Sequence, residues 1–275
     1  MIFVNDIEVK QDHFPDNTLL MKFDPDIIPD DGEDINIWWF YENDAELFTL
    51  IALKRHLDQF FFSKYFRLFM PYIPHARQDR TKTQEDVFTL KYFCEIINSL
   101  NFTTVYVRDA HSNVSLALLE NVKEMPINNY IEKAIEMSGA EVLFFPDEGA
   151  MKRYSSKSKL PYAFGMKKRD WATGKIEGLN LINSEVIVNK KVLIVDDICS
   201  KGGTFFHSAK ALKAAGAKSV SLYITHCEKT IVLGELASTD DLVDHVYTTK
   251  SIFPDYLFEE GNYDPYWHKW ITVFE

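Results

Sequence analysis

The sequence is poor in the residues that mark several specialised classes of protein. Among 275 residues there are 11 glycines, 10 prolines and 3 cysteines, and 30 basic residues stand against 41 acidic ones. So few glycines and prolines exclude a collagenous or low-complexity chain. Three cysteines without CxxC spacing favour neither a disulfide framework nor a structural zinc site. The net charge of −11 argues against a broad nucleic-acid surface.

Long apolar runs are also absent. No uninterrupted run approaches the roughly 20 residues that span a bilayer, and the opening MIFVNDIEVK lacks the basic start and long apolar stretch of a signal peptide. We therefore expect a cytoplasmic protein with reduced thiols and with neither a membrane nor a nucleic acid as partner. Hydrophobic residues make up 46% and charged residues 26%, which is typical of a compact globular chain.

What the sequence does contain is a repeated alternation of short apolar runs with longer amphipathic stretches. Runs such as RLFMPYI, TTVYVRDA, EVLFFPD, KVLIVDD and SVSLYIT indicate strands, and the stretches between them indicate helices. This order predicts an α/β fold with mostly parallel sheets flanked by helices. We expect domains at residues 1–140 and 141–250. An aromatic tail at 251–275 is expected to dock on the body or on a neighbouring subunit.

The most informative run is VLIVDDICSKGGTFFHSAKAL, residues 192–212. An apolar strand leads to Asp196 and Asp197, then to Gly202 and Gly203, and then to a helix that starts near Thr204. A glycine turn at a helix N-terminus can cradle a phosphate, and carboxylates at the end of a strand can accept hydrogen bonds from sugar hydroxyls. A phosphorylated ribose would satisfy both groups, although a bare strand-to-helix turn with two solvated aspartates also fits the pattern.

These motifs together resemble one family. The 192–212 run is similar to the phosphoribosyl-diphosphate (PRPP) loop of type I phosphoribosyltransferases and of PRPP synthetases. Residues 69–112, which contain PHARQD and later DAH, resemble a segment of the ribose-phosphate pyrophosphokinases that plain phosphoribosyltransferases lack. FFPDEGAMKR follows in the family's order. The resemblance covers about residues 36–250 and implies two tandem type I phosphoribosyltransferase-like domains.

The resemblance also implies roles for individual residues. For the ATP site it implies Arg77, Gln78, Asp79 and Arg80. For Mg²⁺ it implies His111 and Asp147, with Asp109 as support. For a basic loop that closes over the reacting phosphates it implies Lys167 and Arg169, and it places His111 among the catalytic residues. For the ribose phosphate it implies Asp196, Asp197, Ser200, Lys201, Gly202, Gly203 and Thr204.

Residues 196–204, here called the acceptor loop, depart from the family pattern D-D-x-x-D-T-x-G-T, because Ser200 and Lys201 replace an acid and a threonine. The added cation is compatible with ribose 5-phosphate, and also with ADP-ribose if Lys201 reaches its diphosphate. Phage-encoded enzymes that resemble this family use ADP-ribose for NAD⁺ rebuilding. The family's adenine-contacting hairpin has no clean counterpart here.

We therefore predict a Mg²⁺-dependent pyrophosphokinase that uses ATP and a ribose-phosphate acceptor. The resemblance further implies a homo-oligomer, either a dimer or a hexamer. Two alternatives remain open. One is a catalytically silent regulatory subunit of a synthetase, which loss of the adenine hairpin favours. The other is a phosphoribosyltransferase that consumes PRPP, which the ARQD and DAH motifs oppose.

Overall fold

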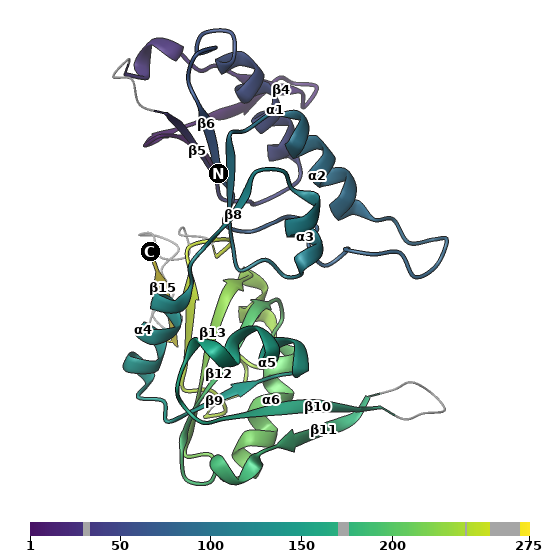
Figure 1. Cartoon of the computed structure of the whole chain (residues 1–275), viewed down its shortest axis with the longest axis vertical. Coiled ribbons are helices and arrows are strands. Elements are labelled where there is room, and N and C mark those ends of the chain that lie inside the picture. Colours follow the sequence, from purple (N-terminus) through teal and green to yellow (C-terminus); the bar gives the residue numbers. More distant parts are fainter. Residues whose placement is uncertain (30–33, 170–175, 240, 254–269) are drawn as a thin grey trace. The chain divides into compact units, whose positions relative to one another are not determined.

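The computed structural model describes residues 1–29, 34–169, 176–239, 241–253 and 270–275, with backbone alone at 167–169 and 176–178. The chain forms two compact units, Met1–Pro126 and Ile127–Glu275. The division falls earlier than the predicted boundary near residue 140. The reason is that α4 (Asn128–Ser138) packs against strands of the second unit. Figure 1 shows the elements of each unit.

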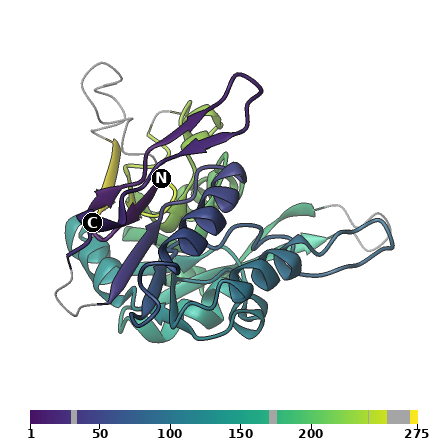
Figure 2. The ribbon, with the colours of Figure 1, turned by 90° about the horizontal axis from the view of Figure 1, so that it is seen from above.

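The first unit contains a six-stranded sheet of order β2-β1-β5-β6-β7-β8. Its strands are β1 (Ile2–Val4), β2 (Ile7–Glu8), β5 (Ile35–Trp39), β6 (Phe66–Phe69), β7 (Thr104–Arg108) and β8 (Val122–Met125). The last four run parallel, and β1 pairs antiparallel with β2 and β5. The helices are α1 (Ala45–Leu57), α2 (Thr89–Ser99), α3 (Asn113–Leu118) and the short 3-10 turn η1 (Pro25–Ile27). A separate hairpin of β3 (Gln11–His13) and β4 (Leu19–Met21) extends from this unit (Figure 2).

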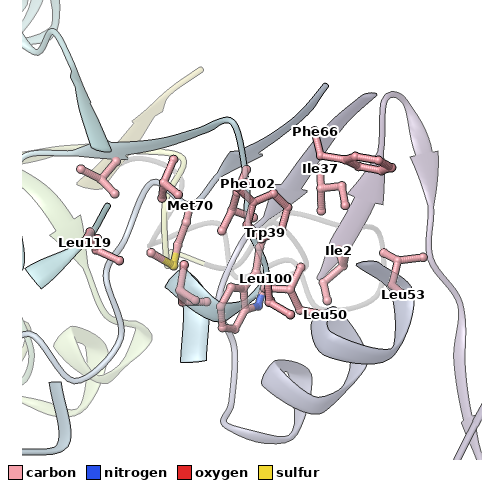
Figure 3. Packing of buried hydrophobic residues seen from close by; sticks show 14 of the residues in the cluster. Ile2, Ile37, Trp39, Leu50, Leu53, Phe66, Met70, Leu100, Phe102 and Leu119 are labelled. Carbon is pink, nitrogen blue, oxygen red and sulfur yellow. The ribbon is translucent and has the colours of Figure 1, made fainter. Parts of the chain in front are cut away.

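Alternation along the strands buries one face of this sheet. In β5, the side chains of Ile35, Ile37 and Trp39 are buried, whereas those between them are partly exposed. The buried side chains meet Leu50 and Leu53 of α1 in one apolar cluster (Figure 3). Burial of this much apolar surface is the main force that holds the helices on the sheet.

The other side of the same strands carries a row of stacked aromatic rings. Trp38 of β5 stacks on Phe69 of β6 with 4.2 Å between ring centroids, and Phe69 stacks on Tyr106 of β7 at 4.6 Å. These residues are direct partners in the strand register, Trp38 with Phe69 and Phe69 with Tyr106. Cross-strand aromatic pairs of this kind stabilise a sheet. The side chains of Trp38 and Trp39 therefore lie on opposite faces of the sheet.

The second unit contains a seven-stranded sheet of order β11-β10-β9-β12-β13-β14-β15. Its strands are β9 (Val142–Phe145), β10 (Tyr162–Arg169), β11 (Ile176–Ile182), β12 (Lys191–Cys199), β13 (Ser219–Cys227), β14 (His245–Thr249) and β15 (Ile271–Phe274). All run parallel except β11, which forms an antiparallel hairpin with β10. The helical elements are α4, α5 (Glu148–Tyr154), α6 (Gly203–Ala214), η2 (Ser155–Lys157), η3 (Ser184–Val186) and η4 (Lys229–Leu233).

Both faces of this second sheet are buried. Along β12, Val192 and Ile194 belong to a cluster that includes side chains of α6, while Leu193 and Val195 belong to a second cluster with α4 and α5. A strand buried on both faces must be apolar at every position, which explains the unbroken run VLIV. The predicted α/β class with mostly parallel sheets is confirmed in both units.

The end of the predicted aromatic tail joins the second sheet as β15, which pairs parallel with β14. Phe253 and Trp270 are buried, and the Trp270 Nε1–H donates to the carbonyl oxygen of Val243 at 3.1 Å. Residues 254–269 lie outside the described part of the chain. No helix among the described residues has the length and apolar character needed to cross a membrane.

Candidate functional site

The two aspartates at the end of β12 have different surroundings. Asp197 is buried, and its Oδ2 lies 3.1 Å from Nη1 of Arg153 on α5. The backbone N–H of Asp197 donates to Oδ1 of Asp196 at 3.0 Å. Asp197 is thus paired with a fixed cation, whereas Asp196 is oriented by the peptide that follows it.

Burial, and secondly the negative charge of Asp197, raise the pKa of Asp196 well above its usual range. The charge of Asp147 acts in the same direction. Asp147 follows β9, which pairs in parallel with β12, so the ends of the two strands bring three carboxyl groups to one edge of the sheet. In open α/β sheets this carboxyl edge is where ligands bind.

Asp147 also organises the start of α5. It is the N-cap residue, and its Oδ1 accepts the N–H of Ala150 at 3.1 Å. An aspartate is well suited to this position because its carboxylate satisfies an amide that has no partner within the helix. The sequence prediction assigned Asp147 to a metal, and the structure shows that one of its oxygens has this structural contact.

The loop after β12 turns at Gly202, which has a φ of 80° and therefore occupies the left-handed region that favours glycine. Helix α6 begins at Gly203, and its Gly202 cap contributes no side-chain hydrogen bond. A Cβ built on Gly203 would meet nothing within 4 Å. Gly203 is exposed, and the first amides of a helix have no partners within it. This positive end of α6 is therefore a favourable place for an anion.

The residues around this turn differ in exposure. Lys201, Gly203 and Thr204 are exposed, and Gly202 is buried. Ser200 Oγ donates to Oε2 of Glu228 at 2.8 Å. Sequence reasoning did not identify Glu228, because the two residues are separated by 28 positions. No pattern in the local sequence links them.

In the first unit, the predicted nucleotide motif follows β6. Asp79 is buried and accepts two hydrogen bonds from the exposed Arg80, Nε to Oδ1 at 2.7 Å and Nη2 to Oδ2 at 2.9 Å. The hydrogen bonding from Arg80, with a smaller electrostatic contribution from His111, lowers the pKa of the Asp79 carboxyl despite its burial. The predicted residues Asp79, Arg80 and His111 thus belong to one electrostatic group within this unit.

The remaining predicted residues of the first unit flank that group. Gln78 accepts a hydrogen bond from Thr89 Oγ1 at 2.6 Å, at the start of α2. Arg77 is exposed. Asp109 follows β7, is buried, and has a φ of 45°, an uncommon conformation that aspartate tolerates better than most residues. Such backbone conformations cluster at functional sites.

The predicted basic pair lies at the end of a hairpin. Lys167 and Arg169 are on β10, with Lys167 opposite Leu179 and Arg169 opposite Ile176 of β11. The register shifts between Lys168 and Arg169. The hairpin extends outward from the second unit (Figure 1). Residues 170–175, which belong to the predicted loop, lie outside the described part of the chain.

A preformed metal cage is not a feature of the described residues. Within the ranges that the structure describes, no group of three or more His, Cys, Asp or Glu side chains is arranged to hold a metal ion. Magnesium usually takes only one or two protein carboxylates together with water and substrate phosphates. Asp147 and Asp109, which the family resemblance assigns to this ion, each carry oxygen ligands of the kind that it prefers.

Comparison with known proteins identifies relatives. A family model described as phosphoribosyl transferase domain matches residues 150–261. Ribose-phosphate pyrophosphokinase from Mycoplasma pneumoniae is 28% identical over 78% of this chain and 66% of the relative. The protein of that name from Thermococcus kodakarensis is 26% identical over 90% of this chain and 86% of the relative. For that from Saccharolobus solfataricus the values are 27%, 66% and 62%.

Among solved structures, phosphoribosylpyrophosphate synthetase from Mycobacterium smegmatis has a TM-score of 0.73 and 19% sequence identity, and the match covers 97% of this chain and 85% of that one. This likeness shows the fold and confirms the predicted architecture. The chain spans slightly less than two thirds of the length of two of the relatives it matches. The predicted resemblance to the ribose-phosphate pyrophosphokinases is confirmed.

Proposed function

We propose that this chain, a divergent relative of the ribose-phosphate pyrophosphokinases, is itself a pyrophosphokinase. The anomeric 1-hydroxyl of a ribose 5-phosphate unit attacks the β-phosphorus of ATP. The bond between that phosphorus and the oxygen bridging to the α-phosphorus breaks, and AMP leaves. The observation that carries this proposal is the end of β12, where two aspartates precede a glycine turn and a helix start without a side-chain cap.

The aspartates suit the ribose. Their carboxyl oxygens accept hydrogen bonds from the sugar hydroxyls, and the ion pair of Asp197 with Arg153 keeps one of them in a fixed orientation. Hydroxyl groups that meet prearranged acceptors lose less freedom when the reaction begins. We assign Asp196 and Asp197 to this role.

The loop after them suits the 5′-phosphate. The amides at the start of α6 donate to its oxygens, and Gly203 leaves the space for it that a side chain would fill. Thr204 adds a hydroxyl donor and Lys201 adds a positive charge. Ser200 and Gly202 are assigned to the conformation of the loop, and neither adds a positive charge. This set of donors is typical of phosphate recognition at a helix N-terminus.

ATP is assigned to the motif of the first unit. Arg77 and Arg80 present planar forks of N–H donors that match phosphate oxygens. Asp79 holds Arg80 through two hydrogen bonds and so limits its motion. Gln78, tied to Thr89, provides an amide at the start of α2.

Mg²⁺ is proposed as the required ion. His111 and Asp147 are the ligands that the resemblance implies, with Asp109 in support, and carboxylate oxygens suit this ion well. When bound, it supplies positive charge that neutralises the phosphate oxygens of ATP. The acidic groups of the chain then face less repulsion from the nucleotide.

Lys167 and Arg169 are proposed to act on the transferring group. Diphosphoryl transfer places negative charge on equatorial oxygens, which cationic side chains stabilise most effectively where water is excluded. A hairpin that extends from its unit is suited to approach a bound substrate. No covalent intermediate with the protein is needed, since orientation and charge stabilisation suffice for this chemistry.

The acceptor is either ribose 5-phosphate or ADP-ribose. Both present the same anomeric hydroxyl and the same ribose. They differ in the substituent on the 5′-phosphate, and the exposed Lys201 lies at the loop where that substituent would begin. A lysine there can pair with the 5′-phosphate of ribose 5-phosphate or with the second phosphate of ADP-ribose, so it is compatible with either acceptor.

The test is AMP release from ATP and Mg²⁺ with each acceptor in parallel, with the diphosphorylated product identified by mass. We expect AMP and a 1-diphosphate from at least one acceptor, and the ratio of kcat/KM values assigns the substrate. Lys167→Ala should abolish most of this activity. Absence of AMP with both acceptors would contradict the proposal and favour a catalytically silent subunit. Base-dependent release of pyrophosphate from PRPP would favour a phosphoribosyltransferase.

We also propose that the chain assembles as a homo-oligomer, either a dimer or a hexamer. The family resemblance implies that a neighbouring subunit completes the ATP site. Light scattering coupled to size-exclusion chromatography, with and without ATP and Mg²⁺, measures the mass in solution. A monomer under both conditions would contradict this part of the proposal.

A further inference from the structure

Glu228 contacts the acceptor loop from the strand next to it. It is the first residue after β13, and its Oε2 accepts hydrogen bonds from Ser200 Oγ at 2.8 Å and from Thr230 Oγ1 at 3.1 Å. The two hydroxyl oxygens lie 3.2 Å apart. One carboxylate oxygen thus joins the loop after β12 to the segment after β13.

The backbone reinforces this connection. The N–H of Glu228 donates to the carbonyl oxygen of Cys199 at 2.8 Å, which continues the pairing of β12 with β13 by one step beyond Cys199 and Cys227. The two chain segments therefore leave the sheet together. Ser200 and Glu228 are held at the point where both loops begin.

A second contact lies a few residues further along. A Cβ added to Gly234 would stand 1.8 Å from the carbonyl oxygen of Lys201, so the segment after β13 touches the loop backbone directly. On the other side of the turn, a Cβ on Gly202 would meet Leu236 at 3.2 Å, and Leu236 itself is buried. The loop at 200–202 is thus packed against residues 228–236.

This arrangement determines what Ser200 can do. A serine hydroxyl has one proton to donate, and that proton is directed to Glu228. Ser200 therefore does not offer it to a phosphate. A carboxylate would itself repel a phosphate, so Glu228 does not contact one either. What the pair fixes is the peptide that leads into Lys201 and Gly202.

We propose that Glu228 is a positioning residue for the acceptor loop. By holding Ser200, it sets the orientation of the backbone that presents Lys201 and the first amides of α6 to the 5′-phosphate of the acceptor. This inference rests on the proposed function of that loop. It assigns to Glu228 an effect on acceptor binding and none on nucleotide binding.

The experiment compares Glu228→Ala, Glu228→Gln and Ser200→Ala with a matched control, Glu235→Ala, which removes an exposed acid from the same segment. Binding of ribose 5-phosphate, ADP-ribose and inorganic phosphate is measured by calorimetry on the full chain, and KM values are measured for acceptor and ATP. Because loss of a hydrogen bond to a charged group changes an equilibrium by about tenfold or more, we expect about tenfold weaker acceptor binding in Glu228→Ala.

The pattern across variants identifies the role. Glu228→Gln keeps an acceptor oxygen for Ser200 and should recover part of the affinity, whereas Ser200→Ala should resemble Glu228→Ala. The KM for ATP and the affinity of Glu235→Ala should match wild type. Circular dichroism and thermal melting establish that each variant is folded. If Glu228→Ala is unfolded, Glu228→Gln and Ser200→Ala still decide.

Unchanged acceptor affinity in folded Glu228→Ala and Ser200→Ala would overturn the inference. Wild-type protein that binds an acceptor or phosphate without releasing AMP would contradict the proposed function but leave the binding comparison decisive for Glu228. Wild-type protein that binds none of the three ligands would overturn both. If the KM for ATP rose in these variants as much as the KM for the acceptor, the inference about Glu228 would also be overturned, because a general structural defect would then account for the effect.

Discussion

Arg153 on α5 forms an ion pair with Asp197 on β12, with 3.1 Å between Nη1 and Oδ2. The side chain of Asp197 is 6% exposed and that of Arg153 is 31% exposed. The helix therefore places a partly accessible cation against an acid that is almost fully removed from water. A buried acid of this kind depends on its partner, because an uncompensated buried charge is costly.

We expect Arg153→Met to destabilise the protein by about 1–3 kcal/mol, since Asp197 would lose its charged partner while the methionine keeps much of the packing. Urea unfolding monitored by circular dichroism measures the change. Lys152→Met is the matched control, because Lys152 is a neighbouring cation whose ion pair with Glu148 is exposed. An equal free energy of unfolding in the two variants would show that the ion pair of Arg153 with Asp197 stabilises the protein no more than an exposed ion pair does.

Asp196→Asn should make the protein more stable at pH 7 while it abolishes AMP formation. The pKa of Asp196 in the folded protein is raised by burial and by Asp197. A carboxyl whose folded pKa exceeds its unfolded value, about 3.9, costs stability as pH rises from the unfolded towards the folded pKa. Thermal melting of both proteins should show a gain at pH 7 that shrinks as the pH approaches about 4. A gain independent of pH would contradict this account.

Two glycines near the acceptor loop should respond in opposite ways to alanine. Gly234→Ala should be destabilising, because its Cβ would overlap the carbonyl oxygen of Lys201. Gly203→Ala should leave the melting temperature equal or higher, since its Cβ meets nothing and alanine favours a helix. In the second variant, however, acceptor affinity should fall because the methyl group would occupy the position proposed for the phosphate. A Gly203→Ala protein with wild-type affinity would place the phosphate elsewhere.

The cysteines should be unreactive in the folded chain. Cys94, Cys199 and Cys227 are all buried free thiols. Burial raises the pKa of Cys94 to about 12, and a side-chain hydrogen bond with Cys199, together with burial, raises the pKa of Cys227. Because the thiolate is the reactive form, alkylation by iodoacetamide at pH 8 should be slow and should become fast in urea. Mass spectrometry measures the rate of alkylation at each cysteine. Rapid alkylation of the native protein would show local opening near the modified thiol.

The strands were the most predictable part of the fold. Apolar runs such as VLIV between amphipathic stretches indicated strands, and the structure shows that VLIV is buried on both faces. By contrast, β8 has the sequence VKEM and no buried side chain, so hydrophobic patterning gave no sign of it. Short or polar elements depend on neighbours that a local pattern does not contain.

One predicted helix begins later than expected. The stretch between the runs RLFMPYI and TTVYVRDA is expected to be helical, but α2 begins only at Thr89. The carboxyl of Asp86 accepts the backbone N–H groups of Lys82 and Thr83, each at 2.8 Å, and so forms a turn that competes with the first helical turn. Local hydrogen bonds of aspartate often have this effect.

The candidate site shows the same limit. The aspartates and glycines of the acceptor loop were identified because they are adjacent in sequence. Glu228 was missed because it reaches the loop from another element and no local pattern links it to Ser200. Arg153 lies within the run FFPDEGAMKR but received no role, since nothing in the sequence pairs it with Asp197. Roles that depend on contacts between strands, or between a strand and a helix, follow only from the folded structure.

The two adjacent tryptophans of β5 provide separate optical reporters for the first unit. Trp39 lies in the apolar core and its Nε1–H donates to the buried Glu46 at 2.9 Å, whereas Trp38 stacks on Phe69 on the opposite face. In a variant that retains only Trp39, the fluorescence would report when water enters the apolar core. A variant that retains only Trp38 would report when the aromatic row across β5, β6 and β7 separates. The order of the two signals during unfolding would reveal which face of the sheet opens first.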